Sequence, residues 1–319
     1  MVEPMDTIKI NYPITGKEFT KSTVAIGSFD GVHLGHQKVI NAAKTLANQS
    51  GTKLAVMIFD PHPLDIIDTT NSPEKITPTA NKLKQLERIG VEICYIMNFT
   101  EEFALLSDQE FTTQILAKMN FGGVVVGFDF RYGKRGKGAA ENLKKYAKEN
   151  NLFKVEIVDA FMIDQIKVSS SRIRSLLLDG KVEEANKLLG RPFNIEGVVV
   201  KGEQRGRTIG YPTINLALKE EYIGLLNGVY VVRAYIDCKS YYGVMNVGSR
   251  PTFYENPADI TYEIHLLDFN QDIYGKELEV DVLNFLRKEK RFEELETLKI
   301  AIEEDIRKME AYVSLLYQK

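Results

Sequence analysis

The sequence is poor in cysteine and has no excess of positive charge. Its two cysteines, Cys94 and Cys238, lie far apart and form no pair with metal-ligand spacing. We therefore expect reduced, partly buried thiols of a cytosolic protein rather than a disulfide or a zinc site. The net charge of −3 provides no positive field for nucleic acid, which argues against a DNA- or RNA-binding protein.

The sequence also lacks a long apolar run. No uninterrupted stretch is long enough to cross a bilayer, and Glu3 and Asp6 near the start argue against a secretory signal. Hydrophobic residues make up 44% and charged residues 27% of the 319 residues, as is usual for globular proteins of one large or two ordinary domains. We expect a soluble, cytoplasmic protein without a membrane or nucleic-acid partner, and the sequence predicts no particular oligomeric state.

The first half of the chain alternates short apolar runs with helical segments. Strands are expected at 22–26, 53–59, 93–97, 123–127 and 154–158, and helices at 34–48, 79–89, 108–119 and 139–149. Asp108 is the expected N-cap of the third helix. Buried strands that alternate with helices favour a Rossmann-like, doubly wound parallel sheet with helices on both faces. Such sheets bind ligands beyond the carboxyl ends of their strands.

The second half changes to the two-residue period of β-structure. Strands are expected at 195–200, 228–236, 241–247, 260–269 and 277–285. They favour an antiparallel β-barrel or sandwich. The segment 292–316 predicts a terminal helix that packs on this barrel. Its apolar residues at helical spacing are Leu295, Leu298, Ile302, Ile306 and Met309. Because the pattern changes near 181–192, we predict domains at 1–185 and 186–319.

The chain has four histidines, and two of them lie in Gly27-Ser-Phe-Asp-Gly-Val-His-Leu-Gly-His36. This run follows a predicted strand and opens a helix, so its glycines allow a tight turn and the helix start offers N–H groups to a phosphate. His33 and His36 stand one helical turn apart and can stabilise charge on an α-phosphate under attack. This pattern favours nucleotidyl transfer over a partial zinc site or a structural helix cap.

Three further motifs lie where the first half would place ligands. Phe59-Asp-Pro-His-Pro63 and Gly127-Phe-Asp-Phe-Arg-Tyr-Gly133 each end a predicted strand and bring aromatic rings that can stack on a flat ring. The first of them could also be an ordinary proline-rich turn. Ser169-Ser-Ser-Arg-Ile-Arg174 begins a helix with serines and suits a triphosphate, although an N-cap followed by surface arginines is the alternative.

Together these segments resemble those of the bacterial bifunctional riboflavin kinase/FMN adenylyltransferase (FAD synthetase) family, and the resemblance covers nearly the full length. The first half is similar to the family's HIGH-type nucleotidyltransferase domain through GSFDGVHLGHQ, FDPHP, GFDFRYG and SSSRIR. The second half is similar to its flavokinase barrel through KGEQRGRTIGYPTINLA, GVYVV, GVMNVGSRPTF, YEIHLLDF and LRKEKRF. The chain departs from the family pattern at Ser28, Ser171 and Ile214, of which Ile214 replaces a smaller alanine.

The resemblance implies two reactions that use ATP and Mg²⁺. The second half would phosphorylate riboflavin to FMN, and the first half would join FMN to the AMP moiety of ATP, giving FAD and pyrophosphate. It implies that His33 and His36 are catalytic, and that ATP also contacts Gly27, Phe29, Gly31, Ser170, Ser171 and Arg174. The flavin contacts that it implies are Phe59, His62, Phe128, Asp129 and Arg131.

The kinase half has a glycine-rich segment that is not a P-loop. Gly202-Glu-Gln-Arg-Gly-Arg-Thr208 is one residue too short, has Arg207 in place of the lysine and precedes no helix. A glycine-rich β-loop over phosphates, with Gly202, Gly206 and Arg207, fits better. The resemblance implies that Thr213 and Asn215 hold Mg²⁺ and phosphate, and oxygen ligands suit that hard cation.

Glu263 and His265 share one face of a predicted strand, opposite Tyr262 and Ile264. The resemblance implies that Glu263 is the base that accepts the proton of the ribityl 5′-hydroxyl, whereas without it a solvent-facing charge would be the interpretation. His265 is interpreted as structural. Two alternatives stay open: a relative that keeps only one activity, for which Ile214 is the feature to examine, and a non-catalytic flavin sensor.

Overall fold

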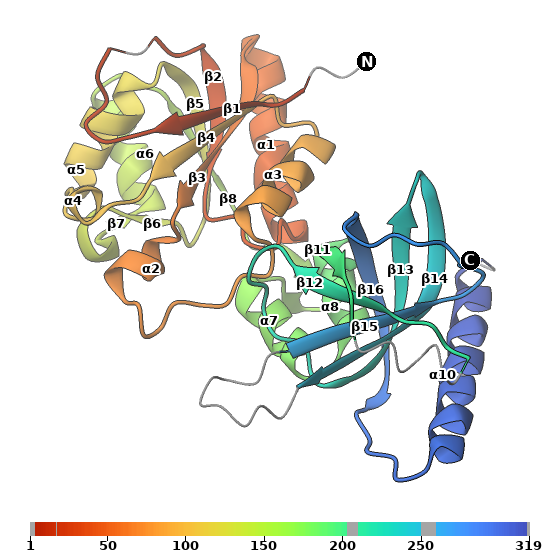
Figure 1. Ribbon diagram of the computed structural model, residues 1–319. Coiled ribbons are helices and arrows are strands. Elements are labelled where there is room, and N and C mark those ends of the chain that lie inside the picture. The colour runs from red at the N-terminus through yellow and green to blue at the C-terminus, as the bar shows by residue number, and fades with distance from the viewer. Residues whose placement is uncertain (1–3, 17, 203–209, 250–259, 318–319) are drawn as a thin grey trace. The chain divides into compact units, whose positions relative to one another are not determined.

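The structure is a computed structural model that describes residues 4–16, 18–202, 210–249 and 260–317. The chain forms two compact units, Met1–Ser170 and Ser171–Lys319, which are coloured red to green and green to blue in Figure 1. The predicted boundary at 185/186 falls within a helix of the second unit, Val182–Leu189 (α8), and stays a prediction.

The first unit is built on one parallel sheet. Its strands, as far as the structure describes the chain, run in the order β1-β4-β3-β2-β5-β8. They are β1 (Asp6–Ile10), β2 (Ser22–Ile26), β3 (Lys53–Asp60), β4 (Ile93–Asn98), β5 (Phe121–Gly127) and β8 (Lys154–Val158). All five predicted strands are confirmed. The edge strand β1 was missed because only Ile10 in it is fully buried, so it lacks the continuous apolar run of the inner strands.

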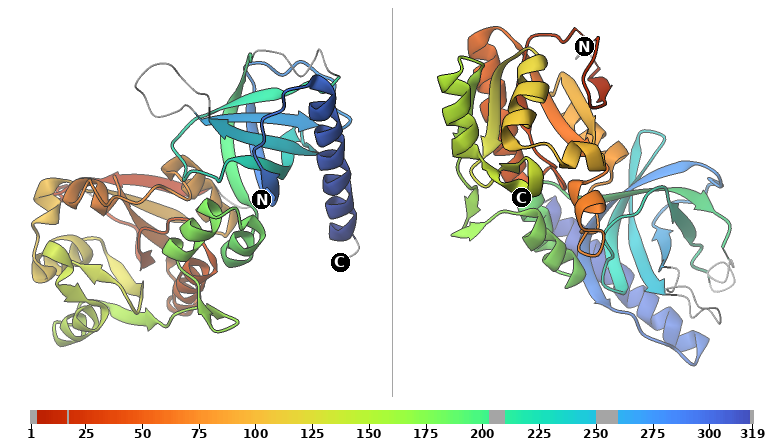
Figure 2. Two further views of the ribbon diagram at one scale, coloured as in Figure 1. Left: turned by 90° about the horizontal axis from the view of Figure 1, so that it is seen from below. Right: turned by 90° about the vertical axis from the view of Figure 1, so that its left-hand side faces the viewer.

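Helices cover both faces of this sheet, as predicted. They are α1 (Leu34–Ser50), α2 (Pro63–Ile67), α3 (Thr79–Arg88), α4 (Glu101–Ala104), α5 (Asp108–Glu110) and α6 (Ala140–Glu149). Ile40 of α1 and Leu86 of α3 belong to one apolar core, and Leu143 of α6 belongs to another. The two cores use alternate residues of the same strands, such as Val56 and Met57 of β3. The views in Figure 2 show the helices on either side of the strands.

The helix expected at 108–119 differs from the prediction. Asp108 is not its N-cap: the Ser107 side chain accepts a hydrogen bond from the Glu110 backbone at 3.2 Å, and the Glu110 carboxylate accepts one from the Ser107 backbone at 2.8 Å. This reciprocal capping box outcompetes a cap by Asp108. After α5 the chain continues as a π-helical turn, Phe111–Ile115, and a 3₁₀ turn, Leu116–Lys118.

Short elements complete the first unit. Two antiparallel pairs not expected from the sequence are β6 (Arg131–Tyr132) with β7 (Gly138–Ala139), and β9 (Met162–Ile163) with β10 (Ile166–Lys167). Between β6 and β7 lies a 3₁₀ turn, Lys134–Gly136. The thiols differ from the expectation, since Cys94 on β4 is fully buried and Cys238 is exposed.

The second unit is a closed antiparallel barrel, which confirms the predicted barrel. The strands form the order β11-β12-β15-β14-β13-β16. They are β11 (Phe193–Val200), β12 (Ile214–Leu218), β13 (Gly228–Ile236), β14 (Lys239–Ser249), β15 (Ile260–Leu266) and β16 (Glu277–Lys288). Two helices precede the barrel, α7 (Ser170–Leu178) and α8, and α10 (Leu295–Leu316) follows it. Figure 2 shows α10 in blue along the side of the barrel.

The terminal helix packs on the barrel through its middle and end. Met309 is buried with Val231 and Leu283, and Ile306 packs against the same cluster. Leu295, in contrast, is 66% exposed, so the prediction that it packs on the barrel is wrong. The helix is fixed instead by Asp305, whose buried carboxylate accepts hydrogen bonds from the Arg287 guanidinium at 2.8 to 3.1 Å. Within the described residues, no helix combines the length and apolar character needed to cross a membrane.

Candidate active sites

The motif loops of the first unit meet at one edge of its sheet. The histidine loop follows β2, while Phe59-Asp-Pro-His-Pro63 ends β3 and Gly127-Phe-Asp-Phe-Arg-Tyr-Gly133 ends β5. Strands β3 and β5 pair with β2 on either side, both in parallel. Because parallel strands end at the same edge, the fold brings the three predicted segments together.

The two histidines of the first loop are stacked. Their ring centroids are 3.5 Å apart at an interplanar angle of 14°. His33 is the N-cap of α1, and its Nδ1 accepts a hydrogen bond from the His36 backbone at 3.2 Å. An imidazole nitrogen that accepts a hydrogen bond carries no proton, so His33 is neutral here, with its proton on Nε2. His33 therefore both caps the helix and presents an N–H donor.

The backbone of this loop is strained at two side-chain-bearing residues. Phe29 has φ 47° and Val32 has φ 41°, in the left-handed region that such residues rarely occupy. The buried Phe29 ring meets His36 edge-on, with centroids 5.2 Å apart. A Cβ at Gly27 would lie 3.3 Å from that ring, which explains the glycine.

Asp30 anchors this loop and was missed by the sequence analysis. Its carboxylate, 3% exposed, accepts hydrogen bonds from the backbone of Ile76 at 3.1 Å and of Thr77 at 2.9 Å. Its carbonyl oxygen accepts one from the Ser170 hydroxyl at 2.8 Å. The structure thus joins the predicted Ser170 to the histidine loop. The aspartate lay within the motif, but nothing in the sequence indicated its backbone partners.

Lys82 on α3 was also missed. Its side chain is 7% exposed, and its ammonium donates to the Ser28 carbonyl at 2.9 Å. A lysine in an amphipathic helix is usually solvated, so nothing in the sequence indicated that this one is buried beside the loop.

The proposed flavin residues of the Phe59 loop have local structural roles. The Phe59 ring packs against Phe99 and Phe103, with centroids 5.9 and 6.1 Å away. His62 is the N-cap of α2, and its Nδ1 accepts from the Leu64 backbone at 3.3 Å. These contacts hold the loop in place at the end of β3.

The segment after β5 presents an aromatic ring and charge. Phe128 is 45% exposed, and the Lys167 ammonium lies 4.5 Å from its ring centroid. The same ammonium lies 2.9 Å from the Asp129 carboxylate. Arg131 is exposed on β6. Ser171 and Arg174 lie on α7 and belong to the second unit.

The second unit aligns polar residues across neighbouring strands. Glu263 on β15 is paired with Asn215 on β12 and with Asn246 on β14. Residues directly opposite one another project on the same face of a sheet, so the three side chains form a row. Glu263 and His265 are half-buried while Tyr262 and Ile264 are buried, which confirms that they share a face. Asn246 lay in a quoted motif, but only the register reveals its place.

The segment before β12 lies against this row. His265 Nδ1 is 2.9 Å from the Pro212 carbonyl oxygen, and its ring meets Tyr211 edge-on at 5.5 Å. Thr213 follows and is half-buried. A Cβ at Gly202 would overlap the Asn215 amide group, so the backbone of Gly202 passes directly over that side chain. Gly206 and Arg207 lie outside the described residues.

Two features help to delimit these sites. Among the described residues, no group of three or more His, Cys, Asp and Glu side chains could hold a metal ion.

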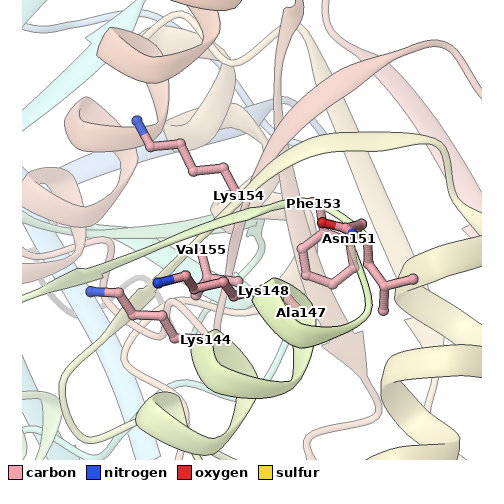
Figure 3. Close-up of a pocket in the computed structure, with 8 residues that line it drawn as sticks. Lys144, Ala147, Lys148, Asn151, Phe153, Lys154 and Val155 are labelled. Carbon is pink, nitrogen blue, oxygen red and sulfur yellow. The ribbon is translucent and has the colours of Figure 1, made fainter.

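A pocket of 510 Å³ is lined by α6 and the start of β8, with Lys144, Lys148 and Lys154 around an apolar floor (Figure 3). It lies at the amino end of β8, so it is not part of the edge where the motif loops meet.

Comparisons with known proteins place both units in one family. A family model described as FAD synthetase matches residues 16–172, and one described as riboflavin kinase matches residues 189–313. The bifunctional riboflavin kinase/FMN adenylyltransferase of Bacillus subtilis is 42% identical, over 98% of this chain and 99% of that protein. The protein of the same name from Listeria monocytogenes is 39% identical, over 98% of this chain and 99% of its own.

A solved structure from Streptococcus pneumoniae, named a macrolide-efflux protein, has the same two-unit fold. It is 36% identical with a TM-score of 0.86, over 95% of this chain and 98% of that one. An α/β unit that matches the FAD synthetase model, followed by a closed barrel that matches the riboflavin kinase model, defines a two-domain nucleotide-dependent transferase. The chain belongs to the bifunctional riboflavin kinase/FMN adenylyltransferase family, which confirms the resemblance found in its sequence.

Proposed function

We propose that this chain makes FAD from riboflavin in two steps. The barrel transfers the γ-phosphate of ATP to riboflavin, giving FMN and ADP. The first unit transfers the AMP moiety of a second ATP to FMN, giving FAD and pyrophosphate. The observation that carries this function is the presence of both family domains, in order, within a chain that matches bifunctional relatives over nearly its full length.

In the first unit, an oxygen of the FMN phosphate attacks the α-phosphorus of ATP. The new P–O bond forms as the bond to the β-phosphate oxygen breaks, and pyrophosphate leaves with those electrons. His33 would donate its Nε2–H to an α-phosphate oxygen, and His36 beside it would stabilise the same developing charge. The stacked arrangement of the two rings and the start of α1, where N–H groups and the helix dipole favour an anion, support these roles.

The remaining substrate contacts for adenylyl transfer are assigned from the family resemblance. ATP would contact Gly27, Phe29, Gly31, Ser170, Ser171 and Arg174. The isoalloxazine and phosphate of FMN would contact Phe59, His62, Phe128, Asp129 and Arg131. For the loop residues beyond β2, β3 and β5, their place at one sheet edge supports the assignment, and for Ser170 its hydrogen bond to the Asp30 carbonyl does.

In the barrel, Glu263 would accept the proton of the ribityl 5′-hydroxyl as that oxygen attacks the γ-phosphorus and ADP leaves. Gly202, Gly206 and Arg207 would lie over the phosphates. The hydroxyl of Thr213 and the amide oxygen of Asn215 are hard oxygen donors of the kind that Mg²⁺ prefers, and Asn215 lies directly opposite Glu263. Mg²⁺ held there would neutralise phosphate charge.

Both activities can be tested in one incubation. Purified protein, riboflavin, ATP and Mg²⁺ are mixed, and the flavins are separated by chromatography over time. FMN should appear first and then convert to FAD. If only FMN forms, the incubation is repeated with reduced flavin. FMN as the only product in both redox states would contradict the adenylyltransferase activity of the first unit. Bound riboflavin without any product would favour the flavin-sensing alternative. Because both reactions consume ATP, we also propose a cytoplasmic location.

A further inference from the structure

A buried lysine lies behind the histidine loop. Lys82 projects from the first turn of α3, and its ammonium donates to the carbonyl of Ser28 at 2.9 Å. Burial lowers the pKa of Lys82, while the charges of Asp30 and Asp60 raise it. The two carboxylates therefore favour the ammonium form in a place where water cannot solvate it.

The same segment holds both neighbouring loops. The backbone N–H groups of Ile76 and Thr77 bind the Asp30 carboxylate at 3.1 and 2.9 Å, and the Thr79 hydroxyl donates to Asp60 at 3.2 Å. Asp30 lies in the histidine loop, and Asp60 begins the turn of the Phe59 loop. The segment 76–82 thus forms hydrogen bonds with both the loop assigned to ATP and a loop assigned to the flavin.

The bond from Lys82 fixes one peptide group of the histidine loop. A trans peptide places its C=O and N–H on opposite sides, so a Ser28 carbonyl aimed at the lysine aims the Phe29 N–H away from it. The same peptide sets the strained φ of Phe29, 47°. Turning this peptide over would bring that φ into the common negative range. The lysine bond opposes that relaxation.

We propose that Lys82 is a positioning residue for adenylyl transfer, which holds the Ser28–Phe29 peptide in its strained orientation and thereby sets the place of the His33–His36 pair. The link to the histidines is direct, because the Phe29 ring lies against His36. This inference rests on the proposed adenylyltransferase function of the first unit.

The test compares lysine variants in the full-length protein. Lys82→Met keeps the approximate length of the side chain but removes its hydrogen-bond donor and its positive charge. Lys82→Arg keeps the donor and the charge. Lys84→Met, on the exposed side of the same helix, is the matched control. We expect Lys82→Met to lower kcat for FAD formation from FMN by about 10- to 100-fold, as a small displacement of catalytic groups does. The KM values for ATP and FMN should change little, and Lys82→Arg should recover much of the loss.

Riboflavin phosphorylation by the same preparations normalises the enzyme concentration, because it takes place in the other unit. Thermal unfolding of each variant reports on the folding of the first unit. Equal kcat for Lys82→Met and Lys84→Met, or equal losses for the Met and Arg variants, would overturn the proposal. A rise in KM for ATP at unchanged kcat would also overturn it. If Lys82→Met does not fold, Lys82→Gln, which keeps a donor without the charge, should show an intermediate kcat, and wild-type kcat in it would refute the role. Wild-type protein that makes no FAD would instead refute the proposed function.

Discussion

The two candidate sites are built in opposite ways. In the first unit the site is mostly backbone: one continuous loop carries left-handed residues, a helix start and two stacked imidazoles. The loop is held through its Asp30 carboxylate, which binds the segment before α3, and through the Lys82 bond to its Ser28 carbonyl. In the second unit the site is mostly side chains: Asn215, Glu263 and Asn246 come from three strands and meet only through register. A backbone-built site leaves a continuous motif in the sequence, and a register-built site leaves scattered residues.

The largest expected difference between the two sites comes from replacing Glu263, which should affect only FMN formation. Replacement by glutamine keeps its size and removes the base, so FMN formation should fall by about 10²- to 10⁴-fold, while FAD formation from supplied FMN is unchanged. Separate assays of the two steps on one preparation measure this. Loss of both activities in a folded variant would contradict the separation of the sites.

His36→Ala should impair the first unit and leave the barrel active. Removing the outer imidazole should lower FAD formation from FMN by about 10²- to 10³-fold, in line with loss of one electrostatic contact to the transition state. Riboflavin phosphorylation serves as the internal control and should stay at the wild-type rate. A wild-type yield of FAD would rule out the assigned role of the histidine pair.

The two units should also differ in stability when one buried ion pair is broken. Arg287→Ala leaves the Asp305 carboxylate buried without its guanidinium partner, which costs about 3–5 kcal/mol. Thermal unfolding should show the second unit melting earlier, with FMN formation lost at temperatures where FAD formation from FMN persists. Lys288→Ala, at an exposed neighbouring position, is the control and should melt like the wild type.

The smallest effect concerns the thiols, of which each unit has one. Burial raises the pKa of Cys94 to about 12, and Cys238 is exposed. Since the thiolate is the reactive form, a thiol reagent at pH 8 should label one cysteine per native chain and both after denaturation. Mass spectrometry of the digested protein identifies the site. Rapid labelling of Cys94 in the native protein would show that β4 opens readily.

Much of the fold could be predicted because its inner elements have uniform environments. Strands buried on both faces, such as β3 with its buried run Leu54–Ile58, are continuously apolar, and alternation predicts an antiparallel barrel or sandwich. The wrong predictions concern residues whose local sequence pattern is overridden by neighbouring residues in the fold. Ser107 rather than Asp108 caps its helix because Glu110 completes a capping box, and Leu295 stays exposed because the helix packs through its later turns.

The sites could be predicted where one motif holds all the parts, as in the run from Gly27 to His36. Sequence spacing could not reveal that Lys82 is buried, because its position depends on how α3 crosses the loop. Nor could it place Asn246 beside Glu263, since strand register is set by pairing across the whole barrel. The roles of the individual site residues remain predictions for the assays above.

The way the barrel closes has a consequence for synthesis of the chain. Strand β11 opens the barrel and pairs with β16, whose paired residues lie 79 to 89 positions later in the chain, and β16 also pairs with β13. On the ribosome, the sheet of the first unit can form as soon as its own strands emerge, since domains generally fold in order. The barrel cannot close before β16 has been made, so in each newly made chain the unit proposed to consume FMN can fold before the unit proposed to produce it.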